Sequence, residues 1–338
     1  MPDTARIASA PADKSLAPGN SARARLRTTT LLSVYAVVPI SVAIALFDRT
    51  LGRGALAAHL PRSPQSLAWF NVFFALPHIV ASSVILIDEE YLRGYRRLLA
   101  TGLVLAAAVA FALPRFASAD LVLALNGLLT IHHVLAQQFG LALGIAGRAA
   151  RIDRLWKWTG LAAGTAVYAL FFLSDRLGAD RLSVLNAFAL AATGLFFAMT
   201  VVRFRAPLGR TARWTGYANF AMVASALWSV RSGYFFFAVL GPRVIHDVTA
   251  FGFYVVHDEN RRRDGKPNPL LGIVSRIPFV GALPALVLTP AIAVLVAAVM
   301  RSVAAAAFVN FVTLFHYWTE RYTWRKGTPH RASVSLGP

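Results

Sequence analysis

The sequence contains no cysteine, which excludes disulfides, thiolate metal sites and iron–sulfur clusters. Charged residues are also scarce, at 14% of 338 residues, whereas a soluble chain carries about 25%. Acids are the scarcer kind, with 15 Asp and Glu against 34 Lys and Arg. Hydrophobic residues reach 57%, and the mean hydropathy is +0.57. These values indicate a chain that lies largely in lipid.

Apolar runs long enough to cross a hydrocarbon core of about 30 Å recur from residue 28 onward. We therefore expect an all-α fold, a polytopic transmembrane helix bundle of about ten spans. The count falls to eight or nine if the segment SGYFFFAVLGP after Arg231 is a surface helix or a re-entrant piece. The predicted spans are 28–47, 67–88, 97–113, 120–146, 156–174, 182–202, 215–237, 243–260, 278–298 and 302–320.

The basic residues predict the orientation of these spans. With the N-terminus in the cytoplasm, 25 of the 34 Lys and Arg lie on the cytoplasmic side, as the positive-inside rule requires. The nine outside are Arg49, Arg53, Arg62, Arg115, Arg176, Arg181, Arg231, Arg243 and Arg301. This topology accounts for the net charge of +19, so we expect the lipid bilayer, and no nucleic acid, as the partner of the basic surface.

The first 27 residues are polar and basic and lack the apolar centre of a signal peptide. We predict three regions in a protein of a bacterial inner (plasma) membrane. Residues 1–27 form a disordered basic cytoplasmic tail, residues 28–326 a transmembrane helical domain, and residues 327–338 a second cytoplasmic tail.

Six of the eight histidines fall within spans, and they occupy only four of the spans: His78 in the second, His132 and His133 in the fourth, His246 and His257 in the eighth, and His316 in the tenth. His59 and His330 fall outside the spans, where we expect them to be solvated. A histidine inside a membrane is costly without a partner and marks a functional site. Pro77 is expected to kink the second span beside His78 and to free a carbonyl there.

Sequence distances give two measures of depth. From the cytoplasmic end, His78, His133 and His246 each precede an arginine by 15 residues, about 22 Å of helix. From the outer end, His133, His257 and His316 follow a charged residue by 13 to 15 residues. The two measures disagree about the eighth span, and we favour the outer one because basic, aromatic helix ends often protrude beyond the lipid.

Helical phase adds a second polar group beside the histidines. His133 and Gln137 share a face at i, i+4, as do His316 and Glu320. His246 and His257 also share a face but stand about 16 Å apart, too far for one metal ion to bind both. Such groups on one side of each helix predict a polar cavity along the axis of the bundle.

Imidazole and carboxylate without thiolate suit iron, copper, zinc or manganese. We predict a non-haem iron centre built from three or four imidazoles, with six candidate ligands: His78, His132, His133, His246, His257 and His316. Asp247, Glu320 and Gln137 are the candidate catalytic residues. Copper and zinc stay open alternatives to iron.

Our leading prediction is therefore a membrane-embedded metal-dependent oxidoreductase, an oxygenase that acts on a hydrophobic substrate such as a lipid or isoprenoid. The sequence contains no Gly-rich nucleotide motif. Reductant is therefore expected from an electron-donor protein or a quinone.

Histidines spread over several transmembrane helices resemble the membrane carotene-cleaving dioxygenases of the Brp/Blh type. The resemblance is one of layout and hydropathy over the span region, and it implies iron held by such histidines. The HxxxH and HxxHH boxes of membrane desaturases and hydroxylases are absent, which argues against desaturation.

Three other interpretations stay open. A haem b bridging imidazoles of two spans would make the protein an electron-transfer cytochrome. Intramembrane histidines and acids also relay protons in proton-coupled transporters. In a structural or assembly protein, the same histidines would stabilise helix packing.

Overall fold

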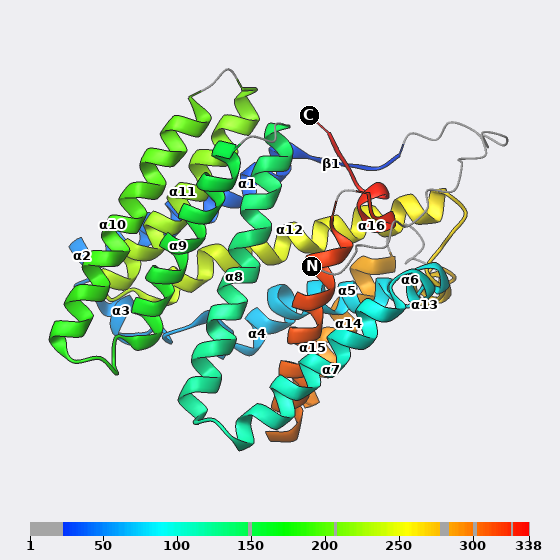
Figure 1. The fold of residues 1–338 in the computed structure, drawn as a ribbon, viewed down its shortest axis with the longest axis horizontal. Coiled ribbons are helices and arrows are strands. Elements are labelled where there is room, and N and C mark those ends of the chain that lie inside the picture. The colour runs from blue at the N-terminus through cyan, green and yellow to red at the C-terminus, as the bar shows by residue number, and fades with distance from the viewer. Residues whose placement is uncertain are drawn as a thin grey trace.

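The computed structural model describes residues 23–147, 151–205, 208–277, 284–299, 303–325 and 327–337, and these fold almost entirely into helices (Figure 1). The N-terminal third contains α1 (Thr28–Ser33), α2 (Val37–Thr50), α3 (Ala55–His59), α4 (Ala68–Phe70), α5 (Leu76–Ile85), α6 (Glu89–Gly94) and α7 (Arg96–Ala107). The long helices α8 (Ala119–Ala146), α9 (Arg151–Leu173), α10 (Ala179–Phe204), α11 (Arg210–Arg231) and α12 (Phe235–Arg263) follow. The chain ends with α13 (Pro269–Val274), α14 (Pro284–Val299), α15 (Val303–Thr323) and α16 (Pro329–Ala332).

Within the described parts of the chain, five helical segments are long and apolar enough to span a membrane: Thr28–Thr50, Ala68–Ile85, Arg96–Phe116, Ala124–Ala146 and Ala179–Phe204. Three of them include turns of 3-10 or π-helix, which join α1 to α2, α4 to α5, and extend α7. The all-α class predicted from the sequence is confirmed, and the apolar helices indicate a membrane protein. Each of the ten predicted ranges contains a helix.

The predicted boundary between the seventh and eighth spans is wrong. Helix α11 ends at Arg231, Gly233 takes a positive φ of 82°, and α12 starts at Phe235. The segment SGYFFFAVLGP therefore begins the next helix, which runs unbroken through Pro242 for 29 residues. Arg243 lies eight residues inside α12 and is buried, so it does not mark an outer helix end.

Helix α12 passes through the middle of the molecule. The helices α8 to α11 lie on one side of it, and α5, α7, α14 and α15 lie on the other (Figure 1). Small residues let α8 and α9 approach closely, because a Cβ at Gly160 would come 2.7 Å from Phe139 and one at Gly164 would come 2.1 Å from Leu135. These contacts also fix the antiparallel register of the two helices.

The helix before Pro77 is irregular, as predicted. Residues Asn71–Ala75 form a turn of π-helix, and α5 starts with Pro77 in its first turn. Such bulges are frequent at functional sites. Here the turn places His78 Nδ1 3.5 Å from the Phe74 carbonyl.

The two ends of the described chain meet. Strand β1 (Arg25–Arg27) pairs in parallel with β2 (Ser335–Gly337), and Asn260 of α12 donates to the carbonyls of Ala24 and Ser333. Residues 25–27 are therefore a strand where we expected a disordered tail. Residues 1–22 of the predicted tail lie outside the described residues.

His330 is buried in α16, which corrects the prediction that it is solvated. Its ring stacks on Tyr91 with 3.9 Å between centroids and on His257 with 5.1 Å. The paired strands hold α16 against the end of α12, and this packing removes His330 from water. His59 is exposed, as expected.

Candidate metal centre

Four helices bring four imidazoles together: His78 of α5, His133 of α8, His246 of α12 and His316 of α15. Going round the group, neighbouring ring centroids lie 5.0 Å (His78–His246), 4.9 Å (His246–His133), 5.2 Å (His133–His316) and 5.0 Å (His316–His78) apart. The rings form a closed circuit, and three of the four side chains are fully buried. We call these four residues the histidine circuit.

Ligand atoms of the histidine circuit are close enough to share an ion. One nitrogen each from His78, His246 and His316 lies within 4.8 Å of the others, and the same holds for His133, His316 and Glu320. Because His316 belongs to both groups, they describe one centre. Imidazole ligands bind a metal ion at about 2.0–2.1 Å, so a small inward shift of the rings suffices.

Hydrogen bonds orient two of the imidazoles. The Ser82 hydroxyl donates to the Ile79 carbonyl, so its oxygen accepts from His316 Nδ1, 2.6 Å away. On His78, Nδ1 faces the Phe74 carbonyl and lies 3.3 Å from Asp247 Oδ1. Both rings therefore carry their proton on Nδ1 and present the Nε2 lone pair to the centre, as metal-bound histidines do.

The nitrogens that face the centre have no hydrogen-bond partner among the described residues. These atoms are Nε2 of His78, His133, His246 and His316, together with Nδ1 of His246. Leaving a buried polar group unsatisfied costs about 1–3 kcal/mol. His133 Nε2 has a carboxylate neighbour, Glu320 Oε2, at 3.2 Å. A cation bound among these nitrogens would satisfy all of them together.

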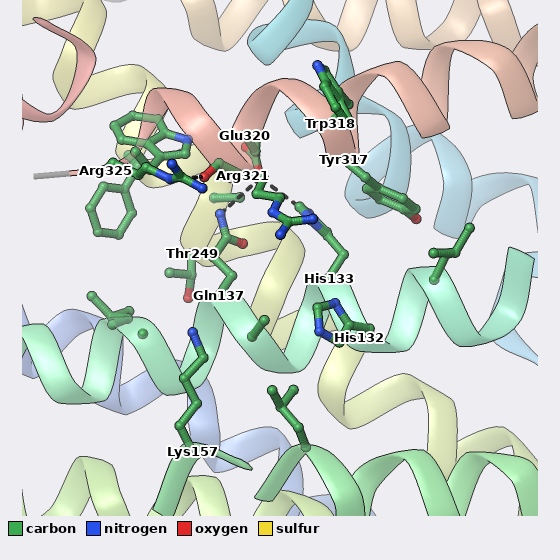
Figure 2. A pocket seen from close by; sticks show the side chains of 18 of the residues that line it. His132, His133, Gln137, Lys157, Thr249, Tyr317, Trp318, Glu320, Arg321 and Arg325 are labelled. Atoms are coloured by element: carbon green, nitrogen blue, oxygen red, sulfur yellow. Dashed lines mark hydrogen bonds and ion pairs between the residues drawn. The ribbon is translucent and has the colours of Figure 1, made fainter. Parts of the chain in front are cut away.

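Glu320 connects the histidine circuit to its surroundings. One of its oxygens, Oε2, lies 3.2 Å from His133 Nε2 and 3.7 Å from His316 Nε2 and accepts from Gln137 Nε2 at 3.0 Å. The other, Oε1, accepts a short hydrogen bond from the Tyr254 hydroxyl. Figure 2 shows Gln137 and His133 reaching Glu320 from α8. Glu320 and Gln137, two of the predicted catalytic residues, thus lie at the centre.

Asp247, the third predicted catalytic residue, lies behind His78. Its Oδ1 is 3.3 Å from His78 Nδ1 and 3.2 Å from Arg243 Nη2, but 4.0 Å from His246 Nε2. A buried carboxylate between an imidazole and a guanidinium is an orienting group. Arg243 offsets the charge of the carboxylate inside the protein.

Two of the six predicted ligands lie apart from the histidine circuit. His132 is exposed, precedes His133 by one residue, or about 100° round the helix, and lines a neighbouring cavity. His257 accepts from or donates to the Tyr91 hydroxyl, 2.8 Å from its Nε2, among the rings of His330 and Trp324. Our preference for the outer measure of depth on the eighth span was wrong, because α12 starts before Arg243.

Three residues beside the circuit were not predicted. Ser82 follows His78 by four residues, Arg243 precedes Asp247 by four, and Tyr254 follows Asp247 by seven, or two helical turns. The i, i+4 and i, i+7 spacings place each on the face of a predicted site residue. This signal was present in the sequence, although serines and tyrosines at such spacings are too common to single out.

A cavity of about 860 Å³ adjoins the centre. His133, Gln137 and Glu320 form part of its wall (Figure 2), and helices α7, α8, α9, α12 and α15 contribute lining residues. The cavity gives a small molecule access to the histidine circuit from one side.

Comparison of the chain with known protein families, with curated proteins and with solved structures finds no match. The site is therefore interpreted from its own residues and geometry.

Proposed function

We propose that this protein is a membrane-embedded metal-dependent oxidoreductase, an oxygenase that uses non-haem iron and acts on a hydrophobic substrate such as a lipid or isoprenoid. The observation that carries the proposal is the buried group of four imidazoles from four helices, in which His316 shares one group of possible ligand atoms with His78 and His246 and another with His133 and Glu320. The layout resemblance to membrane carotene-cleaving dioxygenases points to the same class. Copper and zinc would fit the same ligands.

The protein residues have separate tasks in this proposal. His78, His133, His246 and His316 would hold the metal, and iron(II) with open positions would supply the activation of dioxygen. Ser82 and Asp247 keep the rings of His316 and His78 in the tautomer that binds metal.

Glu320 is the group placed to exchange protons. Its Oε2 lies between the histidine circuit and the cavity, and its Oε1 accepts from Tyr254. Gln137 holds the carboxylate with its amide and leaves Oε1 without a partner among the described atoms. A substrate in the cavity would thus contact Glu320, which can carry a proton, and Gln137 Oε1, which can accept a hydrogen bond, beside the metal.

The geometry favours this function over the two alternatives that also bury histidines. A haem needs a flat space between two axial imidazoles, whereas every ring here lies within 5.2 Å of two others on different sides. A proton relay needs its groups in series across the membrane. The four imidazoles instead form a closed circuit at one place.

We also propose ten spans with both ends in the cytoplasm, in a bacterial inner membrane. The pairing of β1 with β2 supports this arrangement. Hydrogen-bonded strands lie on one side of a bilayer, so the helices between them must cross it an even number of times. The excess of basic residues assigns that side to the cytoplasm.

Metal analysis of the detergent-purified protein and of variants at these six histidines tests the proposal. We expect His→Ala and His→Gln changes at His78, His133, His246 or His316 to remove most of the iron. His132→Ala and His257→Ala are matched controls and should keep it. Iron retained by every variant would overturn the proposal, and a haem absorbance band would replace it with the cytochrome function.

A further inference from the structure

The cavity beside the histidine circuit has an unusual distribution of charge. The described residues of its wall include five basic side chains and only one acid, Glu320, which is already bound to Gln137 and Tyr254. The basic residues are Arg154, Lys157, Arg321, Arg325 and Arg331. None of the five forms an ion pair with an acid in the part of the chain that the structure describes.

Elsewhere the protein pairs its enclosed arginines. Arg203 binds Asp153, Arg243 lies 3.2 Å from Asp247, and Arg261 lies 2.7 Å from Asp88. The cavity cations differ from these three arginines: Arg154, Arg321 and Arg325 are exposed, and Lys157 and Arg331 are half-buried. Five cations around one cavity repel one another, so an anion that enters from outside would offset their charge.

The rest of the wall is apolar and open. Leu105, Val109, Leu129 and Leu314 line it. Gly140, also in the wall, has no atom within 4 Å of the position of a Cβ. A volume of about 860 Å³ lies within the range of roughly 300–1,000 Å³ for small-molecule sites.

The helix register separates the cations of α9 from the metal centre. Gly160 lies against Phe139 and Gly164 against Leu135, so Lys157 lies at the level of residue 142. That level is nine residues from His133, or about 13 Å along the axis. Figure 2 shows Lys157 pointing from α9 toward the space that Arg321 enters from α15.

We propose that this cavity binds a long-chain amphiphile with an anionic head group, a carboxylate or a phosphate. The head lies among Lys157, Arg154 and Arg325, and the apolar chain extends along the leucine wall toward His133 and Glu320. Guanidinium groups bind carboxylate and phosphate through paired hydrogen bonds. The proposal rests on the proposed function for its role as substrate, and it specifies the substrate class as a lipid-like anion.

Quenching of tryptophan fluorescence by brominated lipids tests the proposal, since Trp158, Trp318 and Trp324 line the cavity. The probes are dibromostearate, its methyl ester and a brominated phosphatidylglycerol, added to protein in neutral detergent. Dibromostearate should bind about tenfold more tightly than its ester if two ion pairs contribute. Quenching by the phosphatidylglycerol in preference to the free acid would identify a membrane phospholipid as the source of the head group.

Three variants make the test specific. Lys157→Ala with Arg325→Ala should bring the acid and the ester to similar affinities. Arg213→Ala, on the exposed surface of α11, is the control and should change nothing. Gly140→Leu fills open space, so it should fold and weaken both probes.

Equal binding of acid and ester to the unaltered protein would overturn the proposal, as would equal effects of the cavity and control variants. The titrations are done with and without metal. Loss of the metal centre would then contradict the proposed function alone, because the binding of the head group does not need the metal.

Discussion

Ser82 and Ser83 form a natural pair for testing how the metal centre is held. Both hydroxyls donate to the Ile79 carbonyl, but only the Ser82 oxygen also contacts His316 Nδ1. Because such outer contacts orient the ligand, Ser82→Ala should weaken metal affinity by about 10–100-fold. Ser83→Ala should leave it unchanged. The measurement is competition with a chelator of known affinity, and equal affinities in the two variants would exclude a positioning role for Ser82.

His330 predicts a loss of stability in acid. Burial, and after it the positive charge of Arg261, lower its pKa from the usual 6.5 to about 3. The unfolded chain therefore binds one more proton than the folded chain between pH 3 and 6.5. Stability is fully present above pH 6.5 and is lost as the pH falls through this window, by on the order of 2 kcal/mol between pH 7 and pH 5.

The control for this effect is His330→Phe, which keeps a ring against Tyr91 but cannot be protonated. Titration of Glu90 does not contribute to the pH dependence between pH 5 and 7, because its hydrogen bond to Arg261 lowers its pKa and keeps it ionised. We expect thermal unfolding of the variant to depend less on pH than that of the original protein. Parallel pH profiles would show that His330 is not the titrating group.

At the scale of residues, the sequence predicted which histidines belong to a polar site better than it predicted which of them contact one another. The useful signal was the rarity of histidine within apolar spans, because an imidazole in the membrane costs free energy unless it has a partner. The 11-residue spacing correctly separated His246 from His257 along the helix axis. It could not select between them, because depth depends on where a helix starts, and that start was misplaced by the buried Arg243.

Glycines of α9 decide how closely the helices on one side of α12 can pack. A Cβ at Gly160 would lie 2.7 Å from both Phe139 and Phe196. Gly160→Leu should therefore destabilise the protein by about 1–3 kcal/mol or more through overpacking. Gly194→Leu in α10, where the same position faces open space, should be neutral or slightly stabilising. Thermal unfolding in detergent compares them, and similar losses in both would contradict the packing argument.

At the scale of elements, helices were readily predicted and their ends were not. Apolar length alone locates a span, since the backbone in lipid must satisfy its own hydrogen bonds. The break at Gly233 was missed because the apolar and aromatic segment that follows it, YFFFAVLGP, extends the apolar run of the seventh span. The pairing of residues 25–27 with residues 335–337 joins segments about 300 positions apart, and local sequence patterns do not predict such a contact.

At the scale of the whole molecule, the arrangement of the chain predicts which loops face each side of the membrane. The absence of cysteine allows this prediction to be tested with single introduced thiols. Arg23 pairs with Asp264, and β1 pairs with β2, so both ends and the loop after α12 lie together. Lys266 in that loop should therefore face the cytoplasm. Phe116, which is exposed between α7 and α8, should face the outside.

Single substitutions Lys266→Cys and Phe116→Cys introduce the only thiols in the chain. A membrane-impermeant maleimide should label Phe116→Cys in intact cells with an open outer membrane, and Lys266→Cys only after the inner membrane is permeabilised. The reverse result would invert the orientation and place the cavity cations Lys157 and Arg325 outside, away from the anionic cytoplasmic leaflet. Labelling of both sites in intact cells would mean that an even number of crossings separates them, and the ten-span arrangement would then fail.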